Sequence, residues 1–163
     1  MATPFDNMNA IFYNKIEEDS NFFNYYGLST EQSEALARQR ADACLTEAAT
    51  KLSLSIDADI DFSDYDADLR EFTEDFNKEE QYLLASLQYE EYLLRDIAKL
   101  RANAMRFTSA EQKVFSPANE RRTFQDMYEF VCQKNEELVD RYCAKDRNSG
   151  ALKMLEYEAD SDE

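Results

Sequence analysis

Glycine and proline are scarce in this chain, which has only two of each among its 163 residues. Both residues favour turns and interrupt helices, so their scarcity indicates long helices joined by few tight turns. A chain of this length suits one domain with a single core. Its 10 Tyr and 11 Phe supply bulky side chains for that core. We therefore expect an all-α fold, a small helical bundle with long central and C-terminal helices.

Apolar spacing predicts a short helix near the N-terminus and a longer one after it. From Phe5 to Glu18, apolar residues recur at helical spacing. An aromatic connector follows, so residues 1–28 are expected to form a helical and aromatic segment. Ser29 with Gln32 three residues later is a capping-box pattern, which predicts that the second helix begins there.

The central helix is expected to follow a second capping-box pattern, formed by Asn77 and Glu80. The segment from Lys78 to Met105 is apolar on most of its sides. A helix of this kind is buried by its neighbours, so we place it at the centre of the bundle.

The last helix has a strong start signal, Ser116 followed by Pro117. Its apolar face continues to about Lys145, which closes a connector domain over residues 29–145. The remaining residues, 146–163, are expected to form a flexible acidic tail.

One segment alternates instead of following helical spacing. Each even position from Leu52 to Phe62 is apolar, and each odd position between them is Ser or Asp. Period two is typical of an extended segment with one buried side. We therefore expect an extended, β-like arm over residues 52–76.

Two versions of this arm remain open. In one, a strand spans Leu52 to Phe62 and helical spacing resumes at Ser63. In the other, Leu52 to Leu54 end the preceding helix and Phe72 to Phe76 stays extended.

No second run in the chain alternates as well, so the arm has no obvious strand partner in its own subunit. A lone strand cannot satisfy its own backbone groups. The arm therefore either lies along the helices of its subunit or pairs with another chain. We expect Ile56→Asp or Ile60→Asp to damage assembly, and Asp59→Asn to leave it intact.

The formal net charge is −17, and it is unevenly distributed. Residues 57–80 carry two basic and eleven acidic side chains, whereas residues 81–145 carry ten of each. Nucleic-acid binding depends on Lys and Arg that release counterions from phosphates. The composition therefore argues against a DNA-binding protein, but it is compatible with one that lies near DNA without binding it.

Three cysteines without a CxxC pair favour reduced intracellular thiols. No apolar run approaches the roughly 20 residues that span a bilayer. The N-terminal segment also lacks the basic and apolar regions of a signal peptide. We expect a soluble protein that is made in the cytosol and has no membrane partner.

The acidic arm does not match a calcium-binding loop. An EF-hand that begins at Asp57 would place Asp59 and Asp61 correctly, but it requires Gly where Phe62 stands. Its last ligand would be Asp68 rather than Glu. A solvated acidic face is the simpler interpretation.

The chain contains no His, which excludes Ser-His and Cys-His nucleophile pairs and leaves only Ser-Lys variants open. Neither GxxxxGK[ST] nor GxGxxG occurs, so no phosphate cradle is indicated. We assign no catalytic, cofactor-binding or metal-binding residue and expect no enzymatic activity.

Two phrases resemble a known family. "FTEDFNKEEQYLLASLQYEEYL" (72–93), followed after residues 94–106 by "FTSAEQKVFSPANERRTF" (107–124), is similar to the small neck proteins of tailed bacteriophages, the head–tail connector or adaptor family. The shared features are the helix start over Asp75–Glu80 and the phrase Phe115–Asn119. The resemblance covers about residues 22–145. The long acidic stretch and the acidic tail depart from the family pattern, so the neck layer stays open.

The resemblance implies a structural virion protein at the head–tail interface, made in the host cytoplasm. Such subunits form a ring, typically of twelve, beneath the portal. The ring joins the capsid to tail or stopper proteins, and DNA passes through it without specific binding. No cofactor is implied.

Candidate contact residues follow from this implied assembly. The acidic segment 57–80 of one subunit is expected to face the more basic helix junction 101–122 of its neighbour. Contacts between subunits are assigned to Ile56, Ile60, Phe62, Asp64, Asp66, Arg106, Lys113, Arg121 and Arg122. The portal or another partner is expected to contact Leu152, Met154, Leu155 and Tyr157.

Two functions of other classes are alternatives. An acidic inhibitor that mimics DNA would bind a basic nucleic-acid enzyme in a salt-sensitive way and would form no ring. An enzyme that uses the carboxylates of residues 57–68 with magnesium would lose activity on substitution of Asp59 or Asp61. Neither alternative has a matching motif.

Overall fold

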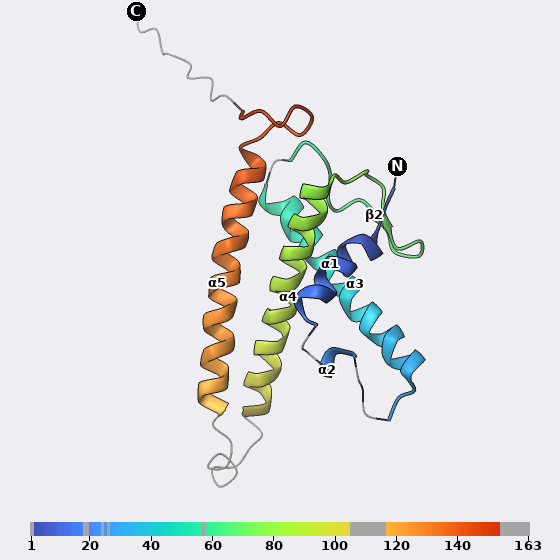
Figure 1. Cartoon of the computed structure of the whole chain (residues 1–163), viewed down its shortest axis with the longest axis vertical. Coiled ribbons are helices and arrows are strands. Elements are labelled where there is room, and N and C mark those ends of the chain that lie inside the picture. The colour runs from blue at the N-terminus through green and yellow to red at the C-terminus, as the bar shows by residue number, and fades with distance from the viewer. Residues whose placement is uncertain are drawn as a thin grey trace, which may run out of the picture.

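Long helices and a small antiparallel sheet make up the fold (Figure 1). The computed structural model describes residues 2–17, 20–23, 25, 27–56, 58–104 and 117–153; within these ranges, the side chains of residues 20, 21, 100–104 and 117–121 are not described. The helices are α1 (Phe5–Lys15), α2 (Ser20–Phe23), α3 (Thr30–Ser55), α4 (Lys78–Ala104) and α5 (Pro117–Cys143). The predicted all-α class is therefore broadly right, but the sheet was not expected.

Two helices begin at the predicted caps. Ser29 Oγ accepts a hydrogen bond from the Gln32 N–H, and Gln32 Oε1 accepts one from the Ser29 N–H. Asn77 and Glu80 make the same reciprocal pair ahead of α4, with N–O distances of 3.0 and 2.7 Å. Each pair satisfies two donors that the first helical turn leaves free.

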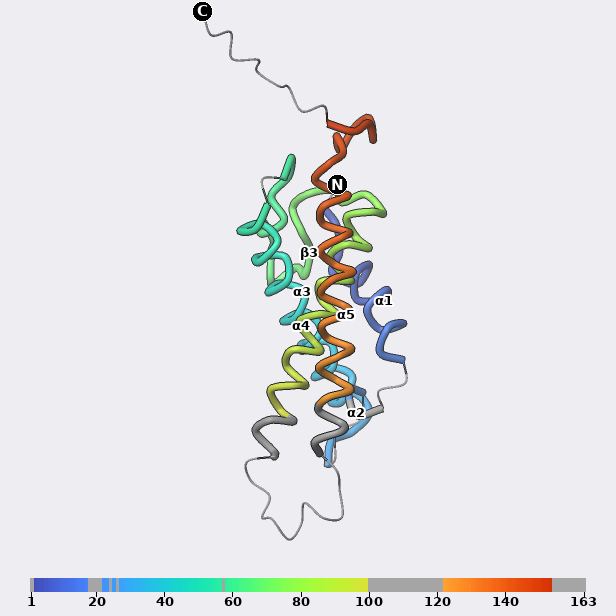
Figure 2. The backbone as a smooth tube through the Cα atoms, turned by 90° about the vertical axis from the view of Figure 1, so that its left-hand side faces the viewer, coloured from blue at the N-terminus to red at the C-terminus, as the bar shows by residue number. Residues whose placement is uncertain are grey.

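The helix α4 lies at the centre of the bundle. It packs against α1 and α3 on one side and against α5 on another. The helices α4 and α5 run antiparallel as a long pair, and α5 forms one edge of the molecule (Figures 1 and 2). The predicted central position of this helix is confirmed.

The sheet lies at the end of the bundle where α4 begins (Figure 1). Its strands are β1 (Thr3–Pro4), β2 (Tyr65–Asp66) and β3 (Glu71–Phe72), in the antiparallel order β1-β3-β2. Phe72 is paired with Thr3 on one side and with Tyr65 on the other. The segment after α3 thus finds its strand partner at the N-terminus of its own chain.

The expected strand over residues 52–62 is wrong, because α3 continues to Ser55. Leu54, which alternation placed on the buried side, is 84% exposed on this helix. No helix starts at Ser63 either; the chain there makes turns and the short strand β2. The second version is confirmed in placing Leu52 to Leu54 on the helix, but of the segment Phe72 to Phe76 only Phe72 belongs to a strand.

The alternation does describe burial in the second half of the segment. Ile56, Ala58 and Ile60 are half-buried against the main core cluster, and Phe62 is fully buried in it. The arm therefore lies along the helices of its own subunit.

The core has two parts. The larger cluster lies beneath the sheet, between α3 and α4, and includes Phe5, Met8, Leu45, Phe72 and Leu84. The second cluster is largely aromatic and joins α1, α2 and α4 through Phe12, Phe22 and Tyr92, whose rings meet edge to face at centroid distances of 5.5–5.8 Å. Edge-to-face contacts of this kind add to the stabilisation from burial.

Candidate functional site

The residues expected to contact partners lie in several parts of the molecule. Leu152 is 74% exposed beyond α5, and Arg122 is exposed on α5 itself. Asp64 and Asp66 are exposed beside the sheet. Five predicted contact residues lie outside the described part of the chain, and a sixth, Arg121, has no described side chain; the five are Arg106, Lys113, Met154, Leu155 and Tyr157.

One predicted subunit contact needs correction. Phe62 is 0% exposed, and its ring packs edge to face on Tyr142 and at a tilt on Phe76. The Phe62 side chain cannot contact another subunit, because it is completely buried in the core of its own chain. Ile56 and Ile60 are partly covered in the same way.

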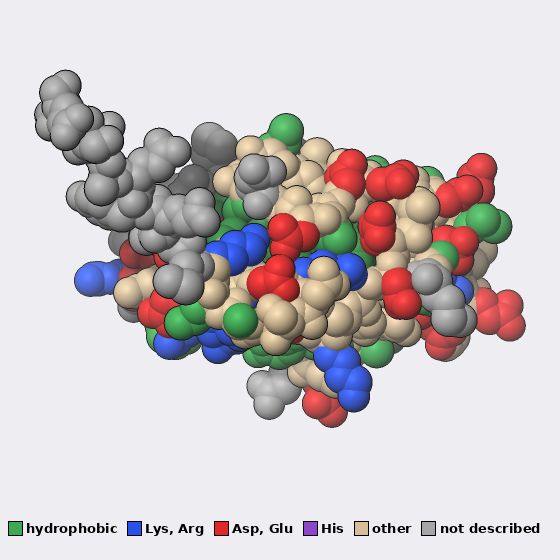
Figure 3. Space-filling model, turned by 90° about the horizontal axis from the view of Figure 1, so that it is seen from above, with side chains coloured by type: hydrophobic (Ala, Val, Ile, Leu, Met, Phe, Trp, Pro, Cys, Tyr) green, Lys and Arg blue, Asp and Glu red, His purple; other side chains and the backbone are tan. Residues whose placement is uncertain are grey.

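Carboxylates gather over the half of the molecule that carries the sheet, as seen from above (Figure 3). The segment between α3 and α4 carries exposed Asp residues at short intervals. The acidic character predicted for residues 57–80 is thus exposed to solvent.

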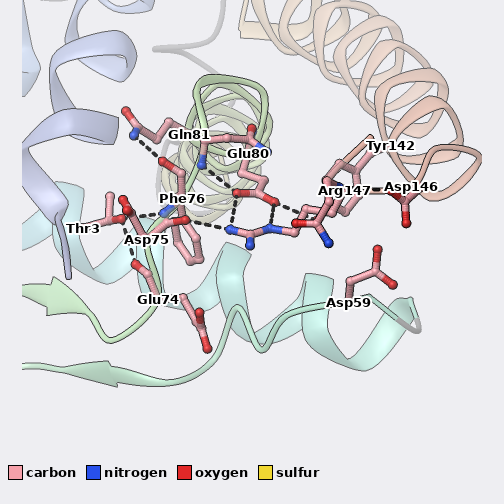
Figure 4. Close-up of polar contacts among 12 residues, drawn as sticks. Thr3, Asp59, Glu74, Asp75, Phe76, Glu80, Gln81, Tyr142, Asp146 and Arg147 are labelled. Carbon is pink, nitrogen blue, oxygen red and sulfur yellow. Dashed lines mark hydrogen bonds and ion pairs between the residues drawn. The ribbon is translucent and has the colours of Figure 1, made fainter. Parts of the chain in front are cut away.

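A buried ion pair fastens the chain beyond α5 to the beginning of α4 (Figure 4). The Glu80 side chain is 0% exposed. Arg147 donates to both of its oxygens, from Nε to Oε1 at 2.6 Å and from Nη2 to Oε2 at 3.2 Å. Burying a carboxylate is tolerated only when it has an opposite charge beside it and is hydrogen-bonded. Here the guanidinium of Arg147 provides the charge and two hydrogen bonds.

Tyr142 and Asn77 complete the bonds to this carboxylate. The Tyr142 hydroxyl donates to Glu80 Oε1 at 3.0 Å, and the Asn77 N–H donates to Oε2 at 2.7 Å. Burial and the charge of Glu80 raise the pKa of Tyr142, so this hydroxyl stays protonated. Glu80 therefore serves both as a helix cap and as the anchor of Arg147.

The loop that carries Arg147 is folded back on itself. Asp146 Oδ1 accepts hydrogen bonds from the Ser149 N–H and hydroxyl, each at 2.7 Å, and Lys145 forms a β-bridge with Leu152. The predicted acidic tail thus begins with an ordered loop. This loop holds the exposed Leu152 at the sheet end of the molecule.

A second exposed leucine projects from the turn between β2 and β3. We call residues 64–69 the acidic loop; it carries the exposed side chains of Asp64, Asp66 and Asp68, and Leu69 is 68% exposed. Asp66 Oδ1 accepts hydrogen bonds from the N–H groups of Asp68 and Leu69, at 2.8 and 2.9 Å. The turn is therefore held by its own side chain.

Arg70 fixes the acidic loop to the bundle. Its φ of 56° is in the left-handed region that residues other than glycine rarely adopt. The guanidinium donates to both Asp42 oxygens, at 2.7 and 3.0 Å, and to Asp6 Oδ1 at 2.8 Å. The hydrogen bonds to Asp42 are the largest contribution that raises the pKa of Arg70. The loop is thus presented in a fixed position despite its unfavourable backbone.

A groove of about 410 Å³ runs between α4 and α5 on the side of α1. We call it the basic groove, because Lys15, Lys134 and Arg141 line it together with one carboxylate, that of Glu137. Of its three aromatic side chains, Tyr89 is half-buried, whereas Tyr82 is 47% exposed and Phe130 is 60% exposed.

A second groove, of about 430 Å³, lies on the other side of α5, towards α3. We call it the acidic groove; Lys51 is the only cation among its lining residues, whose carboxylates are Glu90, Glu91, Glu136 and Asp140. Lys51 Nζ lies 2.5 Å from an oxygen of Glu91, whose side chain is 5% exposed.

Among the residues that the structure describes, no three His, Cys, Asp or Glu side chains are arranged to hold a metal ion. In the same part of the chain, no helix is long and apolar enough to cross a membrane. No protein-family model, curated protein or solved structure matches the chain.

Sequence reasoning missed both grooves and the Glu80–Arg147 pair. The grooves combine side chains from α1, α3, α4 and α5, which no local pattern connects. Glu80 and Arg147 are 67 positions apart. The signal that was present is the capping-box pattern of Asn77 and Glu80, which located the buried carboxylate but not its second partner.

Proposed function

We propose that this protein is a structural head–tail adaptor of a tailed bacteriophage. In this proposal it forms a ring, typically of twelve subunits, beneath the portal in the virion neck. The ring joins the capsid to tail or stopper proteins and lets DNA pass without specific binding. Its role is assembly, and no catalytic step is assigned to it.

The observation that carries the proposal is the position of the two family-like phrases in the fold. The first contains the cap of α4, with the reciprocal bonds between Asn77 and Glu80. The second contains Pro117, the first residue of α5. Both phrases therefore open helices, and these two helices pair with each other along the molecule (Figure 2).

Two further features support the proposal. Exposed apolar side chains are held in ordered positions, Leu152 by the loop beyond α5 and Leu69 by the acidic loop. Single exposed apolar side chains are common on protein surfaces, so what supports the proposal is that both leucines are held in fixed positions from which they could contact another protein. The strong negative charge also suits a ring around DNA, because carboxylates repel phosphates.

The test is the state of assembly with and without the portal protein of the same virus. We expect size-exclusion chromatography with light scattering and negative-stain imaging to show rings of the protein on the portal. A protein that stays monomeric and does not bind the portal would contradict the proposal. A salt-sensitive complex with a basic nuclease, formed without any ring, would favour the DNA-mimic alternative.

A matched pair of variants tests the predicted portal contact. Leu152→Asp places a charge on the exposed leucine beyond α5, and Leu54→Asp does the same at the end of α3, where the leucine is 84% exposed. We expect only Leu152→Asp to weaken portal binding. Equal portal binding by both variants would remove Leu152 from the contact.

A further inference from the structure

The basic groove has the features of a binding site for another protein. Its Tyr82 and Phe130 side chains are largely exposed, with Lys15 Nζ 5.0 Å from the centre of the Tyr82 ring and Lys134 Nζ 5.8 Å from that of Phe130. Aromatic side chains in pockets are the usual energetic centres of protein interfaces. Its volume of about 410 Å³ is in the range of pockets that enclose small ligands, about 300–1,000 Å³. One apolar side chain of another protein, together with the residues next to it in that protein, would fill the groove.

Two of the three cations of the groove, Lys134 and Arg141, form only exposed ion pairs. Lys134 Nζ lies 3.3 Å from Glu137, and both side chains are more than half exposed. Arg141 Nε lies 3.7 Å from Glu79. Exposed pairs of this kind contribute little, about 0–1 kcal/mol. Incoming carboxylates can therefore replace them at small cost.

The acidic loop carries the complementary features. It offers one apolar side chain, Leu69, among three exposed carboxylates, and Arg70 holds it in place. A rigid segment loses little freedom on binding, which favours affinity. The backbone strain at Arg70 is also of the type found at functional sites.

The loop cannot enter the groove of its own subunit. In Figure 1 the turn between β2 and β3 lies at the right edge of the molecule, whereas α5 forms the left edge. Anchored to Asp6 and Asp42, the loop cannot move across the bundle. The complementary surfaces can therefore meet only between copies.

We infer that the acidic loop of one copy docks in the basic groove of the next, with Leu69 against Phe130 and Tyr82 and the loop carboxylates near Lys15, Lys134 and Arg141. Because the two surfaces are different, the contact is heterologous and repeats from copy to copy, closing into a ring when the rotation allows. The inference rests on the proposed function for its biological role and specifies how neighbouring subunits of that ring recognise each other.

The test uses two variants that each disable one side of the contact. Leu69→Lys brings a cation to the cationic groove, and Phe130→Glu brings a carboxylate to meet the acidic loop. Both residues are more than half exposed, so the fold is expected to stay intact, as circular dichroism melts would show. Each variant alone should weaken self-association at least about tenfold. Leu54→Lys, on another exposed leucine, is the matched control and should assemble as the unmodified protein does.

Mixing the two variants gives the sharper result. The Leu69→Lys copy retains an intact groove and the Phe130→Glu copy an intact loop, so the mixture should recover association and form at least a one-to-one dimer. Light scattering measures this directly. Raising salt from about 0.1 to 1 M, which shortens the screening length from about 10 to 3 Å, should weaken the dimer.

The outcomes separate the inference from the proposed function. Rings that form unchanged from either variant, or a mixture that stays monomeric, would overturn the docking and leave the adaptor role standing. Self-assembly that depends on both residues in a protein that ignores the portal would support the docking and contradict the adaptor role. An unmodified protein that stays monomeric with and without the portal would overturn both.

Discussion

The two grooves beside α5 are similar in size and opposite in charge. The basic groove, of about 410 Å³, and the acidic groove, of about 430 Å³, are lined by neighbouring residues of the same helix. In the basic groove, Lys134 and Glu137 are both exposed. In the acidic groove, the exposed Lys51 holds the buried carboxylate of Glu91.

This difference shows that cationic side chains have two roles beside α5. Lys51 offsets a buried charge and therefore belongs to the fold, whereas the cations of the basic groove offset only exposed charges. The helix α5 packs mainly against α4, which leaves both of its flanks open. One flank thus contains an ion pair with a buried partner, whereas the ion pairs of the other flank join exposed side chains.

The largest effect is expected from a substitution that removes the ion pair between Glu80 and the chain beyond α5, the helix that separates the two grooves. Arg147→Met leaves the fully buried Glu80 without its cation. Removing one partner of a buried pair is costly, so we expect the free energy of unfolding to fall by about 3 kcal/mol. Urea denaturation followed by circular dichroism measures this loss.

Lys153→Met is the control for that experiment. Lys153 lies 3.4 Å from Asp59, and both side chains are more than two-fifths exposed. Its removal should change the unfolding free energy by less than about 0.5 kcal/mol. Similar losses in both variants would show that the Glu80 pair is no stronger than a surface pair.

The same substitution in each groove tests the comparison directly. Lys51→Met should destabilise the protein by about 2 kcal/mol, because the buried Glu91 loses a charge-assisted hydrogen bond. Lys134→Met should cost less than about 0.5 kcal/mol, since its partner is exposed. Chemical denaturation of both variants side by side measures the two changes in unfolding free energy. Equal changes would show that the two grooves do not differ in this respect.

Alkaline pH should reduce the difference between Lys51→Met and the unmodified protein. Burial lowers the pKa of Lys51, but the hydrogen bond to Glu91 and the charges of Glu91, Glu47 and Glu90 together outweigh it, so the pKa is raised above its usual value. A raised pKa means that the contribution is complete below the unfolded value and is lost as pH rises through the folded value. The difference should stay constant from neutral pH to about 10 and shrink above it. A difference that already falls at neutral pH would point to another group.

The smallest expected effect is a change in chemical reactivity on assembly. Lys134 lines the basic groove and Cys132 lines the acidic groove. If the basic groove receives the acidic loop, acetylation of Lys134 should slow severalfold in assembled protein while alkylation of Cys132 is unchanged. Mass spectrometry of the modified peptides reports both rates. Protection of Cys132 alone would assign the contact to the other groove.

Helix starts were predictable because their signals are local. The Ser29–Gln32 and Asn77–Glu80 patterns each involve residues three positions apart, and both pairs form as expected. The predicted boundaries of α4 and α5 agree with the structure to within two residues. Such caps act within one turn and need no knowledge of the rest of the fold.

The sheet was not predictable by the same means. Its strands have two residues each, too few to show a period. The strand β3 also pairs with residues far away in the sequence, Thr3 and Pro4. The alternation from Leu52 to Phe62 misled because its first four residues belong to α3, where Leu54 points to solvent.

The acidic character of the candidate contact surface could be predicted from the sequence, whereas its role in contacts stays a prediction. The acidic character of residues 57–80 indicated a negative surface, and Asp64 and Asp66 are exposed on it. Its expected basic counterpart was placed in the junction 101–122, whose side chains are outside the described residues except for Arg122. The cations that the structure gathers, on α1 and α5, come together only through tertiary packing.

The position of Glu80 has a consequence for how the molecule unfolds. Its carboxylate is bonded to Asn77 at the start of α4, to Tyr142 near the end of α5 and to Arg147 beyond it. Nearby, the Thr3 hydroxyl donates to the Glu74 carbonyl and accepts from the Phe76 N–H. We therefore expect the segments around Thr3, Glu80 and Arg147 to open together. In amide hydrogen exchange they should behave as one cooperative unit, although more than sixty positions separate each from the next.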